Sequence, residues 1–291
     1  MEPDVISLEN AIDIHFHPYP DLIPRATDDR GVVERAQACG LRAVVLKCHF
    51  ESTVGRAYDV NQQFGGIEVY GGIVLNRHVG GVNPAAVETS VRLGAKVVWM
   101  PTVDADHHAR TYGFTGSYDK QKSDARPVEP ISIVKDGKLT QDCQDVLDIL
   151  ASYGSAALAT GHFSAEDVDL LVRAAVERGV RVVLQHVFFK IPAMSIDQIR
   201  SLTALGAVAE LEYCGISPFW QWEGQSLNLM RQGIAEVGAE HFLLISDAGQ
   251  RHNPLPPDCL RLLAQGFYEK GVTREELRTM MVTNPARVLG I

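Results

Sequence analysis

Short apolar runs recur along this chain, and their spacing constrains the fold more than any other feature. Eight of them have the composition of buried strands: AIDIH (11–15), AVVLKCH (43–49), EVYGGIVL (68–75), KVVWMP (96–101), SAALATGH (155–162), RVVLQH (181–186), AVAELEY (207–213) and FLLISD (242–247). Near-continuous aliphatic runs are typical of parallel strands that are buried on both faces. Most successive runs begin about 25–35 residues apart, which is enough for one strand, one helix and two loops.

The segments between the runs have a helical pattern. One apolar stripe at three- and four-residue spacing consists of Val168, Leu171, Val172, Ala175 and Val176. Ser164 with Asp167, and Ser195 with Gln198, resemble capping boxes that open helices after the fifth and sixth strands. Eight strands linked by helices predict an α/β fold, with one (β/α)8 TIM barrel as a single domain over residues 1–291. An open, doubly wound sheet is the main alternative.

One interval, from about residue 104 to 140, is too long for a simple link between the fourth and fifth strands. Within it, Asp136-Gly137 lies between two short segments at 131–134 and 139–140. Asp-Gly is a strong signal for a tight hairpin turn. We therefore expect an insertion that covers the active face as a lid and returns through a small hairpin. A surface loop without a function is the alternative.

The charge and cysteine content exclude several classes of protein. Lys plus Arg is 27 and Asp plus Glu is 36, which gives a net charge of −9. An acidic chain without a long basic stretch is a poor candidate for binding nucleic acid or an anionic membrane. The five cysteines are scattered and never spaced as Cys-x-x-Cys, and the first residues do not resemble a signal peptide. We therefore expect a cytoplasmic protein that acts on a small molecule, and a homo-oligomer is plausible for a barrel of this kind.

Histidines and one aspartate stand at the ends of four predicted strands. His15 and His17 end the first strand, His162 the fifth, His186 the sixth and Asp247 the eighth. Residues two apart on a strand share a face, so His15 and His17 should both point into the barrel. The carboxyl ends of barrel strands meet at one mouth, where such enzymes place their chemistry. The five side chains therefore predict a metal site at this mouth.

The same pattern resembles the amidohydrolase superfamily, whose metal-dependent hydrolases carry His-x-His on strand one, histidines on strands five and six, and aspartate on strand eight. The matching residues here are His15, His17, His162, His186 and Asp247. The segments ATGHFSAED (159–167), SDAGQRHNPLPP (246–257) and NPARVLG (284–290) extend the resemblance to a branch of amidohydrolase-like proteins over most of the chain. The resemblance implies the barrel and metal chemistry, and it implies no particular substrate.

One departure from that pattern bears on how many metal ions we expect the site to bind. Members with two ions usually carry a lysine or glutamate at the end of strand four, and the segment WMPTVD (99–104) has neither. One ion is therefore favoured over two, although Asp104 or Lys47 could supply the missing ligand. Glu212 is either a further ligand or a polar core residue. Zinc suits a set of imidazole ligands, and manganese and iron are alternatives.

These residues predict a metal-dependent hydrolase that uses a metal-activated water molecule, with Asp247 as the general base. The bond attacked is a C–N or C–O bond of an amide, cyclic amide or lactone in a small anionic molecule. The predicted substrate-binding residues are Lys47, His49, Arg77, His78, Trp220 and Arg251. Three alternatives stay open: a metal-dependent decarboxylase of the same superfamily, a phosphoester hydrolase, and a barrel that binds a metal or ligand without turnover.

Overall fold

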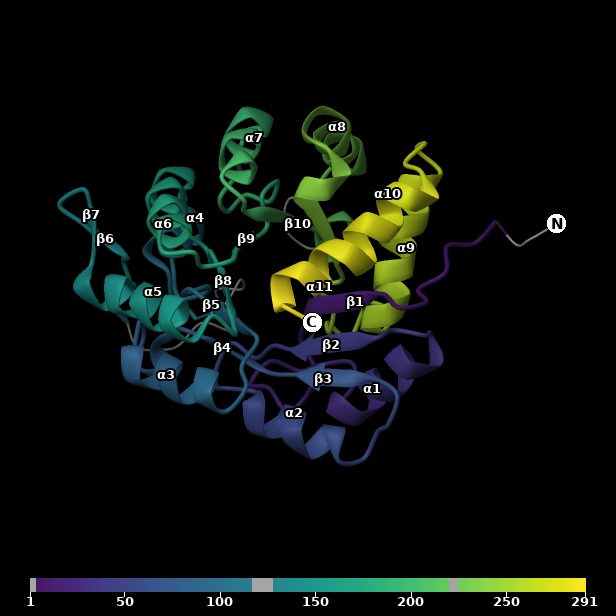
Figure 1. Ribbon diagram of the computed structural model, residues 1–291, viewed down its shortest axis with the longest axis horizontal. Helices are drawn as coiled ribbons and strands as arrows, with labels where there is room; N and C mark the ends of the chain where they lie inside the picture. The colour runs from purple at the N-terminus through teal and green to yellow at the C-terminus, as the bar shows by residue number, and fades with distance from the viewer. Residues whose placement is uncertain (1–3, 117–127, 220–224) are drawn as a thin grey trace.

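The structure is a computed structural model that describes residues 4–116, 128–219 and 225–291 (Figure 1). Trp220 therefore lies outside the described residues. In these ranges the parallel strands are β1 (Ile12–Phe16), β2 (Ala43–Leu46), β3 (Glu68–Tyr70), β4 (Gly72–Val74), β5 (Val97–Trp99), β8 (Ala157–Ala159), β9 (Val182–Leu184), β10 (Val208–Glu212) and β11 (Phe242–Ile245). Each of the eight apolar runs overlaps one of these strands, except that the third run contains both β3 and β4.

The strands form two parallel sheets, ordered β1-β2-β3 and β11-β10-β9-β8-β5-β4. The sheets meet at Gly71, because β3 pairs with β2 on one side of this residue and β4 pairs with β5 on the other. On the opposite side, the Asp247 amide donates to the His15 carbonyl (2.9 Å), and the His17 amide donates to the Ala248 carbonyl (2.8 Å). These contacts join β11 to β1, so the predicted TIM barrel is confirmed and the open sheet is excluded.

Helices surround the strands (Figure 1). They are α1 (Asp29–Ala38), α2 (Val54–Asn61), α3 (Pro84–Arg92), α5 (Gln141–Tyr153), α6 (Ala165–Glu177), α7 (Ile196–Ala204), α8 (Leu227–Val237), α9 (Pro256–Tyr268), α10 (Arg274–Arg278) and α11 (Asn284–Leu289). Ser164 caps α6 by accepting from the Asp167 amide, and Ser195 and Gln198 form a reciprocal capping box on α7. None of the helices in the described ranges combines the length and apolarity that crossing a bilayer requires.

Two apolar layers explain why the strands are almost uniformly hydrophobic. The inner layer fills the barrel and consists of alternate strand residues, among them Ile12, Val45, Trp99, Val208 and Ile245. Val288 and Leu289 of α11 belong to the same layer, so this helix closes the end of the barrel opposite the mouth. The outer layer lies between the strands and the surrounding helices. Because most of the barrel strands are buried on both faces, most of their residues are apolar.

The interval between β5 and β8 contains its own elements. Helix α4 (Asp106–Tyr112) follows β5, and the strands β6 (Val134–Lys135) and β7 (Lys138–Leu139) form an antiparallel hairpin. Asp136 and Gly137 connect them with φ angles of 52° and 72°, the left-handed values that a type I′ turn requires. The predicted hairpin is confirmed. The lid function stays a prediction.

Candidate metal centre

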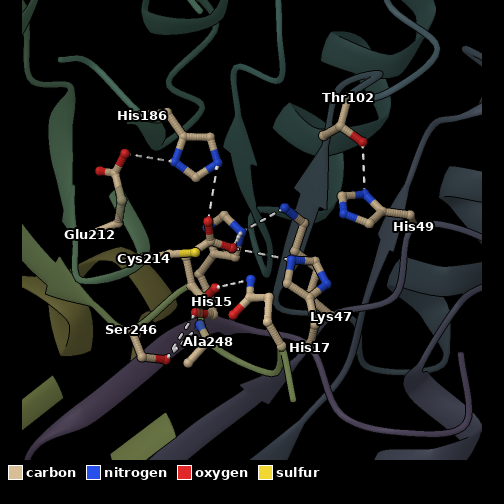
Figure 2. Close-up of polar contacts among 12 residues, drawn as sticks. His15, His17, Lys47, His49, Thr102, His186, Glu212, Cys214, Ser246 and Ala248 are labelled. Atoms are coloured by element: carbon tan, nitrogen blue, oxygen red, sulfur yellow. Dashed lines mark hydrogen bonds and ion pairs between the residues drawn. The ribbon is translucent and has the colours of Figure 1, made fainter. Parts of the chain in front are cut away.

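Three of the predicted ligands converge at the mouth of the barrel. His15, His17 and Asp247 each offer a ligand atom, and these atoms lie within 4.8 Å of one another. Asp247 Oδ1 is 3.1 Å from His15 Nε2 and 3.2 Å from His17 Nε2. Both histidines are buried, whereas the Asp247 side chain is 14% exposed to solvent. The close-up in Figure 2 shows His15, His17 and His186 directed towards the same space.

Local irregularities bring these ligands together. The pairing of β1 with β2 shifts in register between Asp13 and Phe16, which is the segment that carries His15. Asp247 has a φ of 45°, and such a conformation in a residue other than glycine is commonly found at functional sites. A Cβ atom at Gly249 would clash with the His17 carbonyl oxygen. Only glycine therefore allows the loop after β11 to approach β1 this closely.

Strand β10 supplies a carboxylate behind each of two histidines. Glu210 Oε2 lies 3.1 Å from His15 Nδ1, and Glu212 Oε1 lies 3.3 Å from His186 Nδ1 (Figure 2). His186 Nε2 is 3.9 Å from Asp247 Oδ2. Metal-binding histidines typically use their second nitrogen in this way, which fixes the ring and directs the other nitrogen at the ion. Glu212, whose role the sequence left open, therefore lies beside His186.

The sequence analysis did not identify Glu210 as a site residue. The Glu-x-Glu spacing in AVAELEY could have indicated it, because residues two apart on a strand share a face and Glu212 was already a candidate. Glu210 is fully buried, and a buried carboxylate needs a cation or hydrogen-bond donors.

The charges of the centre are strongly coupled. Burial and Lys47 lower the pKa of His15, whereas the carboxylates of Glu210 and Asp247 raise it, and the resulting pKa is about 9. Burial raises the pKa of Asp247, but the charge of His15 and hydrogen bonds from His15 and His17 hold it well below its usual value. Burial lowers the pKa of Lys47 to about 8. Asp247 is therefore the anion around which this cluster is organised.

The side chain of Lys47 lies within the candidate metal centre. Its Nζ is 2.7 Å from His15 Nε2 and 5.3 Å from the centroid of the Trp99 ring. The side chain is 1% exposed, although it carries an amine at the end of an apolar strand. An ammonium and an imidazolium at 2.7 Å repel each other, so burial and this contact together disfavour the state in which both are charged. Whether Lys47 binds substrate stays a prediction.

His49 belongs to a hydrogen-bonded network beside the centre. Its ring stacks on His17 at a centroid distance of 4.5 Å, and its Nδ1 is 2.9 Å from Thr102 Oγ1 (Figure 2). Asn76 donates to the same hydroxyl (2.9 Å) and to the His49 carbonyl (3.1 Å). Burial, followed by the charge of His17, lowers the pKa of His49 well below its usual value. Residues of the loops after β4 and β5 therefore hold the ring in place, and burial favours its neutral form.

The predicted ligand from strand five is held by an unexpected partner. His162 Nδ1 lies 3.2 Å from His108 Nδ1, and the two rings stack with an interplanar angle of 15°. His162 also lies beside His186, with ring centroids 5.6 Å apart. His108 is fully buried and belongs to α4 of the insertion. The structure thus connects the insertion to the row of histidines, which the sequence analysis did not predict.

Asp104 does not join the ligands. Its carboxylate accepts from the Arg77 backbone amide (2.9 Å) and from Arg77 Nη1 (3.1 Å), and His78 Nδ1 is 4.0 Å away. Arg77 neutralises this buried carboxylate, which removes the reason for assigning Asp104 as the missing strand-four ligand. Arg251 is exposed in the loop after β11. The substrate-binding roles of Arg77, His78 and Arg251 stay predictions.

The sequence analysis also did not identify the buried side-chain amide of Gln185. Gln185 follows β9 and precedes His186, its side chain is buried, and neither of its amide atoms has a hydrogen-bond partner among the described residues. Val183, two residues earlier, faces the barrel interior. Buried polar atoms are usually satisfied, so this amide is a candidate for contact with a water molecule or substrate.

The donor set fits a divalent ion. Two imidazole nitrogens and a carboxylate oxygen are the ligands of catalytic zinc sites, which keep a further position open. Glu210 orients His15 from behind, and Glu212 does the same for His186. Neither His17 Nδ1 nor His186 Nδ1 has a hydrogen-bond partner among the described residues, but His186 Nδ1 has the Glu212 carboxylate 3.3 Å away. His15, His17 and Asp247 would hold the ion, and His186, whose Nε2 lies 3.9 Å from Asp247 Oδ2, would be a fourth ligand.

Comparisons with known proteins agree with this fold. A family model described as a family of unknown function (DUF6282) matches residues 10–210. An amidohydrolase from Pseudomonas aeruginosa is 13% identical with a TM-score of 0.65, and the match covers 96% of this chain and 95% of that one. Compared with curated protein sequences, the chain matches none.

Two further solved structures are similar over nearly their full length. A protein from Pseudomonas putida, described as a candidate 2-pyrone-4,6-dicarboxylic acid hydrolase, is 17% identical with a TM-score of 0.62, covering 97% of each chain. An organophosphorus hydrolase from Deinococcus radiodurans is 14% identical with a TM-score of 0.61, covering 96% of this chain and 92% of that one. At these identities the likeness confirms the barrel fold and assigns no role to a residue.

Proposed function

The chain belongs to the DUF6282 family, and we propose that it is a metal-dependent hydrolase acting on a C–N or C–O bond of a small anionic molecule. The observation that carries the proposal is the convergence of His15 and His17 on Asp247 within 4.8 Å at the mouth of the barrel. The three solved structures described above share this fold and are named as hydrolases. Zinc suits the donor set best.

A divalent ion bound here would lower the pKa of a water molecule to about 7 and so supply a nucleophile at neutral pH. Asp247 is suited to act as the general base. Its side chain is 14% exposed, so a water molecule can reach the carboxylate from the mouth. Oδ1 contacts His15 and His17, while Oδ2 lies on the side of His186. Asp247 can therefore orient a water molecule, take its proton and pass it to the leaving group.

Lys47 is suited to stabilise negative charge. Its Nζ lies at the centre rather than at the surface, against His15 Nε2 and over Trp99. The apolar surroundings strengthen its interaction with an anion that enters the mouth. A carboxylate of the substrate, or the oxygen that becomes negative during attack, would satisfy this amine. This is the reason for assigning the substrate as an anion.

Metal analysis and a substrate panel test the proposal. Purified protein should retain close to one equivalent of a divalent ion and should hydrolyse members of a panel of amides, lactones, phosphoesters and aromatic carboxylates. Asp247→Asn should keep the fold and part of the metal and lose turnover by at least about 100-fold, the lower range for a general base. Unchanged turnover in Asp247→Asn would remove the mechanism, and release of carbon dioxide without hydrolysis would establish a decarboxylase instead.

A further inference from the structure

We propose that His108, a residue of the insertion, is a positioning residue that holds His162 as a ligand of the metal centre. The inference rests on the proposed metal-dependent function and extends it to the segment between β5 and β8. It starts from a pattern shared by three histidines of the mouth. In each of them Nδ1 lies against a buried side chain from another element: Glu210 for His15, Glu212 for His186 and His108 for His162.

The contact between His108 and His162 is close and well shielded. The two Nδ1 atoms are 3.2 Å apart, the ring centroids are 5.4 Å apart, and both residues are fully buried. A helix of the insertion carries His108, whereas His162 follows β8 of the barrel. The pair is thus a specific polar contact between the insertion and the barrel wall, where a chance surface contact would be exposed to solvent.

A bound metal ion would decide which of the two histidines donates the hydrogen bond. A hydrogen bond between two Nδ1 atoms 3.2 Å apart needs one proton, which one ring donates and the other accepts. When that proton is on His162 Nδ1, His108 accepts it as a hydrogen bond and His162 Nε2 carries the lone pair that a metal ion requires. The opposite arrangement would place a proton on His162 Nε2 and prevent coordination. With an ion on His162 Nε2, His108 would therefore accept from Nδ1, as Glu210 does from His15.

One difference separates the three contacts. Glu210 and Glu212 are carboxylates, and they increase the basicity of the imidazole in front of them, whereas His108 is an imidazole and increases it less. His162 would consequently be the weakest of the histidine ligands. The insertion would then control this ligand, because movement of α4 would remove the acceptor from His162 Nδ1.

Metal affinity and the tautomer of His162 test the proposal. The dissociation constant for zinc would be measured by competition with a chelator in the wild-type protein and in three variants. His108→Phe keeps a stacked ring and removes the acceptor, and should weaken zinc binding about 10- to 100-fold, as loss of such partners typically does. His108→Asn places an amide oxygen near the position of Nδ1 and should restore affinity to within a few-fold. His107→Phe, on the same helix, should bind zinc as the wild type does.

Nitrogen-15 spectra of labelled histidine give a readout that does not depend on activity. Zinc should leave the proton of His162 on Nδ1 in the wild type, and in His108→Phe the tautomers of His162 should mix. Wild-type affinity and tautomer in His108→Phe would overturn the inference, as would an anomalous peak showing an ion between the two Nδ1 atoms. A wild-type protein that binds no divalent ion would instead reject the proposed function itself. If His108→Phe does not fold, the spectra of the wild type and His108→Asn still decide.

Discussion

The two halves of the barrel mouth are built from similar residues but are organised differently. The metal half, from β1, β10 and β11, consists of His15, His17, Glu210 and Asp247. The network half, from the ends of β2, β4 and β5, consists of His49, Asn76, Arg77, Thr102 and Asp104. In the metal half, imidazole nitrogens face a single carboxylate at 3.1–3.2 Å. In the network half, the buried carboxylate faces a guanidinium at 3.1 Å, and the imidazole faces a hydroxyl.

This difference separates two uses of buried polar groups. A carboxylate surrounded by imidazoles can bind a metal ion together with them when the imidazoles release their protons, whereas a carboxylate paired with arginine is already neutralised. Changes in the metal half should therefore affect metal binding and activity. Changes in the network half should mainly affect the stability of the fold.

The largest effect is expected for His17→Ala. The substitution removes one of three converging ligands, so tightly held metal should fall below about a tenth of an equivalent. Elemental analysis after gel filtration measures this. The matched control is His241→Ala, which changes a partly exposed histidine that precedes β11, at the other end of this strand from Asp247. Normal occupancy in His17→Ala would contradict its assignment as a ligand.

Glu210→Gln should have an intermediate effect. The variant keeps the size of the side chain and removes the charge behind His15 Nδ1, so zinc affinity should fall about 10- to 100-fold while the fold persists. Glu212→Gln, behind His186, should act in the same direction. Chelator competition measures both. Wild-type affinity in both variants would show that β10 serves only the fold.

Thr102→Val tests the network half. Valine has nearly the same shape but no hydroxyl, so His49 Nδ1 would lose its partner in a buried site and Asn76 would lose one of its two acceptors. The free energy of unfolding should decrease by about 1–3 kcal/mol, measured in urea, with metal content unchanged. Thr89→Val, on the exposed face of α3, is the control. Loss of metal without loss of stability would show that the two halves form one unit.

The smallest effect concerns the thiol of Cys48, which lies between Lys47 and His49. Burial raises the pKa of this thiol from 9.0 to about 11, so at neutral pH its reactive thiolate should be about 100-fold scarcer than that of an unperturbed thiol. Alkylation of the native protein should therefore be slow at pH 7 and should accelerate about tenfold per pH unit up to pH 11. Mass spectrometry of the labelled peptides measures the rate, with the less buried Cys39 as reference. A rate independent of pH would show that local opening exposes Cys48.

Much of the fold could be predicted because its signals are local. The apolar runs, the capping residues Ser164 and Ser195 and the Asp136-Gly137 turn each act within a few residues of the chain, and the structure places strands, helix starts and a hairpin there. The break of the third run into β3 and β4 was missed, because the pairing partner changes at Gly71 and a partner is not visible in a local pattern.

Some residues of the candidate site could likewise be predicted from local sequence signals, and others could not. His15, His17 and Asp247 could be selected because each stands at a strand end, and in a barrel those ends must meet. Asp104 was a reasonable substitute ligand by position, yet the loop after β4 brings Arg77 to it. Glu210 carried a recognisable spacing, whereas nothing near His108 in the sequence indicated His162 as its partner.

The sequence by itself determined which side chains stand where each strand ends and that a ring of such strands would carry them. Only the tertiary structure decided which nitrogen of each histidine faces inward, because the groups that fix the rings come from distant parts of the chain. Glu210 lies 195 residues from His15, and His108 lies 54 residues from His162. Contacts of this kind form only when the barrel closes and excludes water from both partners, and no periodicity in the sequence encodes them.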